Sequence, residues 1–380
     1  AFLAIKKASE LIDMSKHFGE HPRMGATDVC PLVPIANIEM DEVVKYAHKL
    51  GERVGKELGI PGYFYEYAAS TEERRNLAVV RKGEYEALKA KLVDPQWQPD
   101  FGPAEFVKAK HTGATAISAR DFLIAYNVNL NTTSTRRANA VAYDIREKGR
   151  IKRVGEVLSG DIVKDADGNT LWTPGKLKHV KAIGWFIEEY GVTQVTMNIT
   201  KITETPLHLA FDETAKAANA RGIRATGSEL VGLVPKSAML EAGKYFLRKQ
   251  NRSTGIHESE LIKIAIKSMG LDELGPFIPE ERIIEYMLES GTDKKLVDLS
   301  LTDFANETAS ESPAPGGGSI SAYAGALGIS LATMVANLSA HKRGWDERWE
   351  EFSDWADKGQ ILKDELLFLV DEDTNSFNKI

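Results

Sequence analysis

The sequence predicts an α+β fold with two α/β subdomains, the first incomplete, followed by a truncated all-α helical bundle. Strand-like and helix-like patterns follow one another over residues 121–228 in the order βαββαβ, which is typical of a ferredoxin-like unit. Residues 297–380 contain helical patterns only. The chain has 380 residues, 43% of them hydrophobic and 27% charged, so it is long enough for two or three globular cores.

The first 120 residues predict one subdomain. Residues 41–58 form its clearest helix, with Asp41 as the expected N-cap and Gly59 followed by Pro61 as the stop signal. The other expected elements are a helix at 2–14, an extended segment at 27–35, an aromatic strand at 63–67, a polar helix at 71–80 and a loop-rich stretch at 94–103. Together they fit a ferredoxin-like unit that lacks its beginning.

Residues 121–290 predict the second subdomain. Its first strand alternates cleanly, with one apolar face made of Phe122, Ile124, Tyr126, Val128 and Leu130. The elements that follow are a helix at 136–147, strands at 179–186 and 193–200, a helix at 207–220, a strand at 222–228, and closing helices at 236–250, 258–268 and 279–288. Residues 161–175 interrupt this order as an expected hairpin insertion, because Asp167-Gly168 is a turn signal.

Residues 297–380 predict a helical domain after a polar boundary at 291–312. No side chain from Ser312 to Ala340 is charged, so length alone would permit a membrane span. The segment is rich in Ala and Gly rather than Leu, which suits a helix packed in a bundle, so no membrane span is expected. The aromatic residues near its end have helical spacing and predict a core or a subunit interface; they are Trp345, Trp349, Phe352 and Trp355. Helical patterns reach both ends of the sequence, so we expect it to be part of a longer protein.

Charge and cysteine content restrict the classes of function. The net charge of −7 argues against general nucleic-acid binding. The single cysteine, Cys30, excludes an internal disulfide and fits a reducing, cytoplasmic location. With no second thiol nearby, we expect Cys30 to be a small buried apolar residue rather than a nucleophile.

The densest run of functional residue types is HFGEHPRMGATDVCPL, residues 17–32, where Arg23 and Asp28 accompany two histidines. His17 and His21 have helical spacing, but the intervening glycine and the following proline predict that the helix ends before the second histidine. His21 would therefore lie on a tight loop, from which a near-neutral imidazole can act as a base. The alternative is a loop histidine that caps a carbonyl. A metal site built from His17, Glu20 and His21 is disfavoured, because no third ligand has diagnostic spacing.

Two further segments combine glycines with basic side chains. In residues 100–120 the loop-shaping residues are Gly102, Pro103 and Gly113, at which the backbone can approach a flat ligand closely. In residues 175–185 three lysines alternate along an extended segment: Lys176, Lys178 and Lys181. The lysines are either a solvated strand face or a basic strip for carboxylates.

Two weaker signals lie on the expected strands and at the start of the helical domain. Asn127, Asn129 and Asn198 lie opposite apolar strand faces, where they either bind substrate amides and carboxylates or bond across the sheet surface. Residues 313–328, PAPGGGSISAYAGALG, open a helix at which backbone N–H groups before Ser319 can hold an anion. A glycine triplet without a Walker lysine does not predict phosphate binding.

The run GEHPRMGATDVCP resembles the signature of formimidoyltransferase domains in the formimidoyltransferase–cyclodeaminase family. More of that family's pattern recurs in the same order: residues 100–120 and 175–185 are similar to its two folate-contacting segments, GSELVGLVP at 227–235 is also characteristic, and residues 313–328 resemble the start of its cyclodeaminase domain. Leu32 stands where a phenylalanine is common, and Lys110 and His111 lie in a slightly lengthened middle of the first segment.

The resemblance implies roles for individual residues. His21 corresponds to the general base of the transferase, and Asp373, in Leu369–Asp373, corresponds to the catalytic aspartate of the cyclodeaminase. The implied folate-binding residues are Gly102, Pro103, Phe106, Val107, Gly113, Gly175, Lys176, Leu177, Lys178, Val180 and Gly184. GSELVGLVP is given no catalytic role.

The resemblance also implies the reaction, which belongs to histidine degradation. A formimino group passes from N-formimino-L-glutamate to N5 of tetrahydrofolate, and the product then closes to 5,10-methenyltetrahydrofolate with release of ammonia. Tetrahydrofolate, polyglutamylated or not, is the co-substrate, no metal is implied, and family cyclodeaminases built across subunit contacts imply a homo-oligomer.

The domains expected on this basis are 1–120, 121–290 and 297–380, without the family's first strand–helix–strand portion and most of its bundle. One alternative is a formyltransferase that uses N-formylglutamate, although formyl transfer leaves no ammonia for a linked cyclodeaminase to eliminate. The other is a folate-binding or scaffold protein without turnover.

Overall fold

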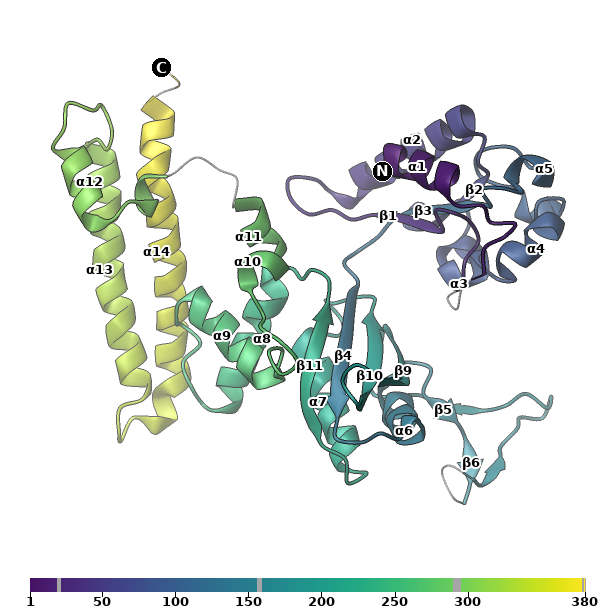
Figure 1. Cartoon of the computed structure of the whole chain (residues 1–380). Coiled ribbons are helices and arrows are strands. Elements are labelled where there is room, and N and C mark those ends of the chain that lie inside the picture. Colours follow the sequence, from purple (N-terminus) through teal and green to yellow (C-terminus); the bar gives the residue numbers. More distant parts are fainter. Residues whose placement is uncertain (19–21, 156–158, 290–294, 378, 380) are drawn as a thin grey trace. The chain divides into compact units, whose positions relative to one another are not determined.

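The structure is a computed structural model that describes residues 1–18, 22–155, 159–289, 295–377 and 379 (Figure 1). Contacts divide the chain into two compact units, residues 1–122 and 123–380. Both units combine helices with strands, which confirms the predicted α+β class.

The first unit is built on a small parallel sheet. Its strands are β1 (Val29–Leu32), β2 (Gly62–Glu66) and β3 (Thr115–Ala119), in the spatial order β1-β3-β2 with both pairs parallel. The central strand β3 is a correction to the sequence analysis, which treated residues 100–120 as loops. The parallel pairing differs from the expected ferredoxin-like unit, because neighbouring strands of such a unit run antiparallel.

Two helices of the first unit occur where they were predicted. These are α1 (Phe2–Leu11) and α2 (Met40–Arg53), which continues through a π-helical turn, Val54–Leu58, and ends at Gly59 with φ of 63°. The N-cap of α2 is Glu39 without a side-chain hydrogen bond, so the prediction of Asp41 as the cap is wrong. Buried Val43 and Val54 of this helix pack in one cluster with Phe64 and Ile117 of the sheet.

The prediction of a single helix at residues 71–80 is wrong. The segment is two short pieces, a 3₁₀ turn at Glu72–Arg75 and α3 (Leu77–Val80), separated by an extended Asn76. Inside the first piece Arg74 turns inward to the carboxylate of Asp100, at 2.7 Å. Asn76 begins the second piece as its N-cap, because its side chain accepts from the Ala78 N–H at 3.0 Å. Elements that the sequence analysis did not assign follow: α4 (Glu84–Lys91), a 3₁₀ turn at Pro95–Trp97 and α5 (Phe106–Ala109).

The second unit contains a four-stranded sheet whose neighbouring strands are all antiparallel. Its strands are β4 (Ile124–Leu130), β9 (Val180–Ile187), β10 (Val192–Ile199) and β11 (Ala225–Val231), in the order β11-β4-β10-β9. Helices α6 (Thr135–Ile145) and α7 (Leu207–Asn219) pack on one face and complete the predicted βαββαβ order (Figure 1). The predicted alternation of β4 is confirmed, because Ile124, Tyr126, Val128 and Leu130 are at most 1% exposed.

The insertion after α6 forms the predicted hairpin. At its tip the Asp165 carboxylate accepts hydrogen bonds from the N–H groups of Asp167 and Asn169, at 3.0 and 2.8 Å, and Gly168 has φ of 83°. Lys164 and Thr170 bridge the two sides of this turn. Short antiparallel pairs continue the ribbon: β6 (Arg153–Val154) with β7 (Asp161–Ile162), and β5 (Arg150–Ile151) with β8 (Trp172–Thr173).

Helices α8 (Lys236–Lys249) and α9 (Glu258–Met269) follow the sheet as predicted. The helix predicted at 279–288 is broken into α10 (Pro279–Arg282) and α11 (Ile284–Glu289). The break has a tertiary cause, because the backbone at Ile283 is extended and forms a bridge with Val234.

The helical region contains α12 (Leu301–Thr308), α13 (Gly317–Ala340) and α14 (Trp349–Phe377), with 3₁₀ turns at Leu296–Asp298 and Asp346–Arg348. α13 and α14 run side by side, with Gly359 directly against the Thr333 side chain (Figure 1). By length and composition alone, α13 is a candidate membrane span. Its assignment to a soluble bundle stays a prediction.

A short loop, Ser253–Gly255, fastens this helical hairpin to the rest of the second unit. The Ser253 hydroxyl donates to Asn337 Oδ1 of α13 at 2.6 Å, and the Thr254 hydroxyl donates to Asp357 Oδ2 of α14 at 2.6 Å. A Cβ on Gly255 would overlap the backbone of α14 at Ala356. The loop therefore fits only because these side chains are small.

Two further expectations concern the aromatic residues and the cysteine. Trp345 stacks on Phe352 with ring centroids 5.2 Å apart. Trp355 is 59% exposed, so the prediction of a core position is wrong for this residue. Its place in a subunit interface stays a prediction. Cys30 is free and half-buried beside the core of the first unit, and this burial raises the pKa of its thiol.

Candidate active site

The predicted base, His21, lies outside the described residues, as do Gly19 and Glu20. The chain on both sides of them is described and is tied down. Arg81 Nη1 donates to the carbonyl of Pro22 at 2.8 Å, and Arg23 Nη2 donates to the carbonyl of His17 at 3.1 Å. The described chain on either side of residues 19–21 is therefore held by an arginine, at His17 and at Pro22.

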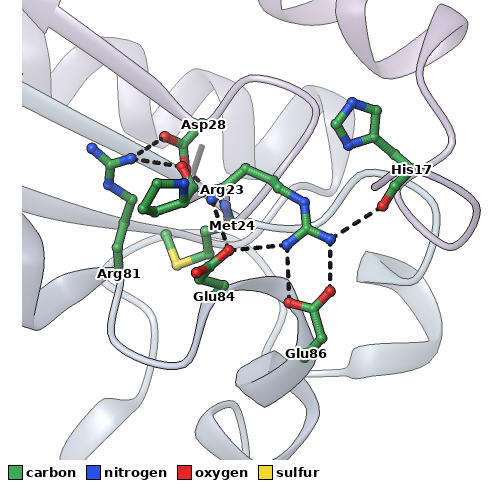
Figure 2. Close-up of polar contacts among 8 residues, drawn as sticks. His17, Arg23, Met24, Asp28, Arg81, Glu84 and Glu86 are labelled. Carbon is green, nitrogen blue, oxygen red and sulfur yellow. Dashed lines mark hydrogen bonds and ion pairs between the residues drawn. The ribbon is translucent and has the colours of Figure 1, made fainter. Parts of the chain in front are cut away.

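Arg23 is the centre of a charged cluster (Figure 2). Its guanidinium contacts Glu84 at 3.1 Å and both carboxylate oxygens of Glu86, at 2.6 and 3.0 Å. The hydrogen bonds to Glu86 raise the pKa of Arg23 and lower the pKa of Glu86, so both groups are held in their charged forms. With a side chain only 12% exposed, Arg23 acts as a fixed anchor for the loop.

Asp28 anchors the other side of the same loop (Figure 2). Its carboxylate accepts from the Met24 N–H at 2.8 Å and from Arg81 at 2.9 Å. Burial raises the pKa of Asp28, and these two donors oppose the rise. Arg81 thus bridges Asp28 and Pro22, and it holds both sides of the turn that follows His21.

Two of the predicted segments come together at Gly113. Gly25 and Gly113 form an antiparallel bridge, flanked by hydrogen bonds from Ala26 N–H to Thr112 O at 2.8 Å and from Ala114 N–H to Met24 O at 3.0 Å. Gly113 has φ of 67°, and a Cβ there would overlap the backbone of Met24. Residues 24–26, which follow the predicted base in the sequence, and residues 112–114 of the segment 100–120 are therefore parts of one backbone arrangement.

The remaining residues of that segment differ in exposure. Gly102 has φ of 76° and lies directly against the carbonyl of Ile60, so its role in the loop is conformational. Pro103 and Phe106 are half-buried, with the Phe106 ring 6.1 Å from that of Tyr85. Val107 is 88% exposed, so its side chain is free for contact with a ligand.

The third predicted segment, 175–185, lies in the second unit and separates into inward and outward residues. Leu177, Val180 and Gly184 are buried, and a Cβ on Gly184 would overlap α6 at Asn139. Gly175 packs equally closely on the carbonyl of Arg146. These four positions shape the segment through its buried side.

The lysines of the segment point outward. Lys176, Lys178 and Lys181 are all exposed, and Lys181 shares its face of β9 with Ile183 and Trp185. Ile183 and Trp185 are 46% and 45% exposed. The outward face therefore combines positive charge with apolar surface, which suits an aromatic carboxylate.

Asp373 is brought to the glycine motif at the start of α13. Its Oδ2 accepts from the Ser319 N–H at 2.9 Å and lies 3.1 Å from the Ser319 hydroxyl. Ser319 is fully buried, and its hydroxyl also donates to the Val370 carbonyl at 2.7 Å. Two signals that the sequence placed more than 50 residues apart thus form one local arrangement.

Most partners of these residues were not predicted. Glu84, Glu86 and Arg81 lie in or beside α4, a stretch that the analysis left unassigned. Their signal was present only as alternating charge in a polar segment.

Of the three strand asparagines, Asn127 and Asn129 hydrogen-bond across the sheet surface, and Asn198 is exposed. Among the described residues, no group of three His, Cys, Asp or Glu side chains is arranged to hold a metal ion.

Family models match nearly the whole chain in three consecutive segments. Residues 1–120 match "Formiminotransferase domain, N-terminal subdomain", residues 125–289 match "Formiminotransferase domain", and residues 300–380 match "Formiminotransferase-cyclodeaminase".

Individual relatives agree with these matches. The chain is 44% identical over 379 residues to the formimidoyltransferase-cyclodeaminase of Gallus gallus, covering 100% of this chain and 66% of that relative. It is 40% identical over 268 residues to the glutamate formimidoyltransferase of Thermoplasma acidophilum, covering 70% of this chain and 79% of that relative. The chain thus spans about two thirds of the length of its bifunctional relatives and most of the length of the monofunctional one, and it belongs to the formimidoyltransferase–cyclodeaminase family.

Proposed function

We propose that this chain transfers the formimino group of N-formimino-L-glutamate to N5 of tetrahydrofolate and releases glutamate. The observation that carries the proposal is the 40% identity to a glutamate formimidoyltransferase of which the chain covers 79%. His21 is the proposed base that removes the N5 proton as this nitrogen attacks the formimino carbon. A positioned base of near-neutral pKa typically contributes about 10²–10⁴-fold.

The contacts around the predicted segments support this assignment. The chain on either side of His21 is held by Arg23 and Arg81, which suits a base that must be positioned. The outward lysines and Trp185 suit the ring and the glutamate carboxylates of folate. The inward residues of the same segment, Leu177, Val180 and Gly184, keep its backbone in place.

The helical region is the proposed start of the cyclodeaminase. In the longer protein Asp373 would move a proton between the folate ring nitrogen and the leaving amine. The match of residues 300–380 to the family model, together with the contact between Asp373 and Ser319, supports this role.

The proposal extends to the finer features of the protein. These are a ferredoxin-like fold for the second transferase subdomain, a bundle fold for the helical domain, boundaries near residues 120 and 290–297, a cytoplasmic location, a homo-oligomer, and no requirement for metal or nucleic acid. The antiparallel order β11-β4-β10-β9 supports the first of these for the second subdomain.

The test is product formation from tetrahydrofolate and N-formimino-L-glutamate, followed by glutamate release and ultraviolet absorbance. Wild-type chain should release glutamate, and His21→Ala should release at least about 100-fold less while keeping its circular dichroism. Full activity of His21→Ala would overturn the assigned base. Turnover with N-formylglutamate but none with the formimino donor would favour the formyltransferase instead.

A further inference from the structure

A pocket of about 460 Å³ lies in the second unit where α6 begins and α7 ends. The residues that line it come from these two places in the sequence: Ser134, Arg136, Arg137, Ala140, Ala220 and Arg221. None of the residues assigned above to folate or to group transfer is among them. A pocket of this size accommodates a small molecule, because ligand sites commonly span roughly 300–1,000 Å³.

Positive charge dominates the side chains that line the pocket. Half of them are arginines, and none carries a carboxylate or an aromatic ring. Arg136 and Arg137 are exposed, and within the part of the chain that the structure describes neither side chain forms an ion pair. Both lie in the first turn of α6, which contains no acidic residue. The two guanidiniums are therefore free to pair with a ligand.

The third guanidinium, that of Arg221, shares its carboxylate with another arginine. Asp144 of α6 forms ion pairs with both Arg221 and Arg150, and these three side chains are at most 28% exposed. Burial and the charge of Arg221 lower the pKa of Arg150, and the Asp144 carboxylate opposes this. One negative charge thus serves two positive charges, so Arg221 adds to the positive charge of the pocket rather than cancelling it.

These groups restrict the chemical class of the ligand. A guanidinium has donors only, and its planar fork matches the oxygens of a phosphate or a carboxylate. Three guanidiniums suit a multivalent anion better than a single carboxylate, and a phosphate monoester carries about −1.5 to −2 charges at pH 7 with three acceptor oxygens. A nucleotide is disfavoured, because no aromatic side chain lines the pocket for a base to stack on.

We propose that this pocket binds a phosphate group, either as the free ion or as the monoester of a small polar molecule. Arg136 and Arg137 pair with the phosphate oxygens from the exposed side, and Arg221 does so from a position fixed by Asp144. The volume exceeds what the free ion fills, which leaves room for the polar body of an ester. The site is separate from the residues of the proposed transfer, so it does not depend on that function.

The test measures binding of inorganic phosphate, ribose 5-phosphate and ribose to the full chain by calorimetry. Wild type should bind at least one of the two phosphates and should not bind ribose. Arg136→Gln and Arg137→Gln each remove one exposed charge, so each should weaken phosphate binding about tenfold and keep the circular dichroism of wild type. Arg343→Gln, which removes the same charge from the exposed turn between α13 and α14, should leave the affinity unchanged.

The outcomes identify the form of the ligand and test the site. With the expected losses in Arg136→Gln and Arg137→Gln, tighter binding of ribose 5-phosphate than of inorganic phosphate supports a monoester, and any other order supports the free ion. The inference is overturned if wild type binds neither phosphate, if both variants bind like wild type, or if Arg343→Gln loses as much affinity as they do. Binding of tricarballylate, a tricarboxylate, in place of both phosphates would overturn it as well.

Discussion

The contact between Asp373 and the start of α13 leads to a prediction with a built-in control. Asp373 Oδ1 lies directly over Gly318, where an added Cβ would overlap the carboxylate, whereas an added Cβ on Gly317 meets nothing within 4 Å. Neither glycine has a positive φ. Gly318→Ala and Gly317→Ala are therefore the same chemical change, one residue apart in one helical turn, and only the first touches Asp373.

The expected magnitudes follow from these contacts. Replacing glycine by alanine inside a helix stabilises it by up to about 1 kcal/mol, and both variants gain part of this. Gly318→Ala also displaces the carboxylate, which loses its 2.9 Å bond from the Ser319 N–H. A hydrogen bond to a charged group contributes about 1.5–3 kcal/mol, and the low end applies to an exposed aspartate. We expect Gly318→Ala to be less stable than Gly317→Ala by about 1–2 kcal/mol.

Hydrogen exchange of the Ser319 amide measures this difference locally. Its exchange should be about 5–30-fold faster in Gly318→Ala than in Gly317→Ala, because about 1.4 kcal/mol corresponds to tenfold. Asp373→Asn, which keeps the size and removes the charge, should fall between them. Equal exchange in the two alanine variants, or faster exchange in Gly317→Ala, would refute the contact.

Three further predictions concern the cores. Asp100→Ala leaves the buried Arg74 guanidinium without its carboxylate partner and the Phe64 N–H without its acceptor, so it should destabilise the first unit by about 3–5 kcal/mol in urea unfolding. A loss below about 1 kcal/mol would contradict the importance of this pair. Gly184→Ala forces β9 away from α6, so the variant should be less stable than wild type by about 1–3 kcal/mol, measured as a lower thermal midpoint. An unchanged midpoint would show that the helix can move aside. Burial lowers the pKa of His208 to about 4, from 6.5 in the unfolded chain, so the unfolded state binds more protons between these values. Stability should therefore fall by roughly 3 kcal/mol as pH drops from about 6.5 to about 4, and His208→Phe should remove this part of the pH dependence measured by urea midpoints.

Long elements with one buried face were predictable from the sequence. β4 shows an apolar residue at every second position because only one face of the sheet is covered by helices. β3 was missed because all five of its residues are buried, so no alternation exists to be read, and its Thr-Ala-Ile-Ser-Ala sequence is short and small. The break at Ile283 was missed because its cause is a distant partner, Val234. At Asn76 the cause is local, because the asparagine side chain caps the helix that follows it.

Parts of the candidate site were predictable from glycine, because few other residues adopt a positive φ. Gly102 and Gly113 were predicted to shape loops, and both have the positive φ that favours glycine. The alternating spacing of the lysines near β9 predicted that they are exposed. The same spacing did not predict which of their neighbours are buried. The partners of Arg23 lie about 60 residues away, and a single sequence carries no information about pairs at that distance.

The Ser253–Gly255 loop changes how the boundary between the transferase and the helical segment should be understood. Two segments match different family models, residues 125–289 and residues 300–380, and a covalent linker joins them. The packing contact between them is made by this loop and by the residues of α13 and α14 that it touches. Linker length and sequence are then free to vary without separating the two parts. A side chain at Gly255, in contrast, would disturb the packing of both segments at once. In fused enzymes of this kind we therefore expect the residues of this contact, rather than those of the linker, to be restricted in size.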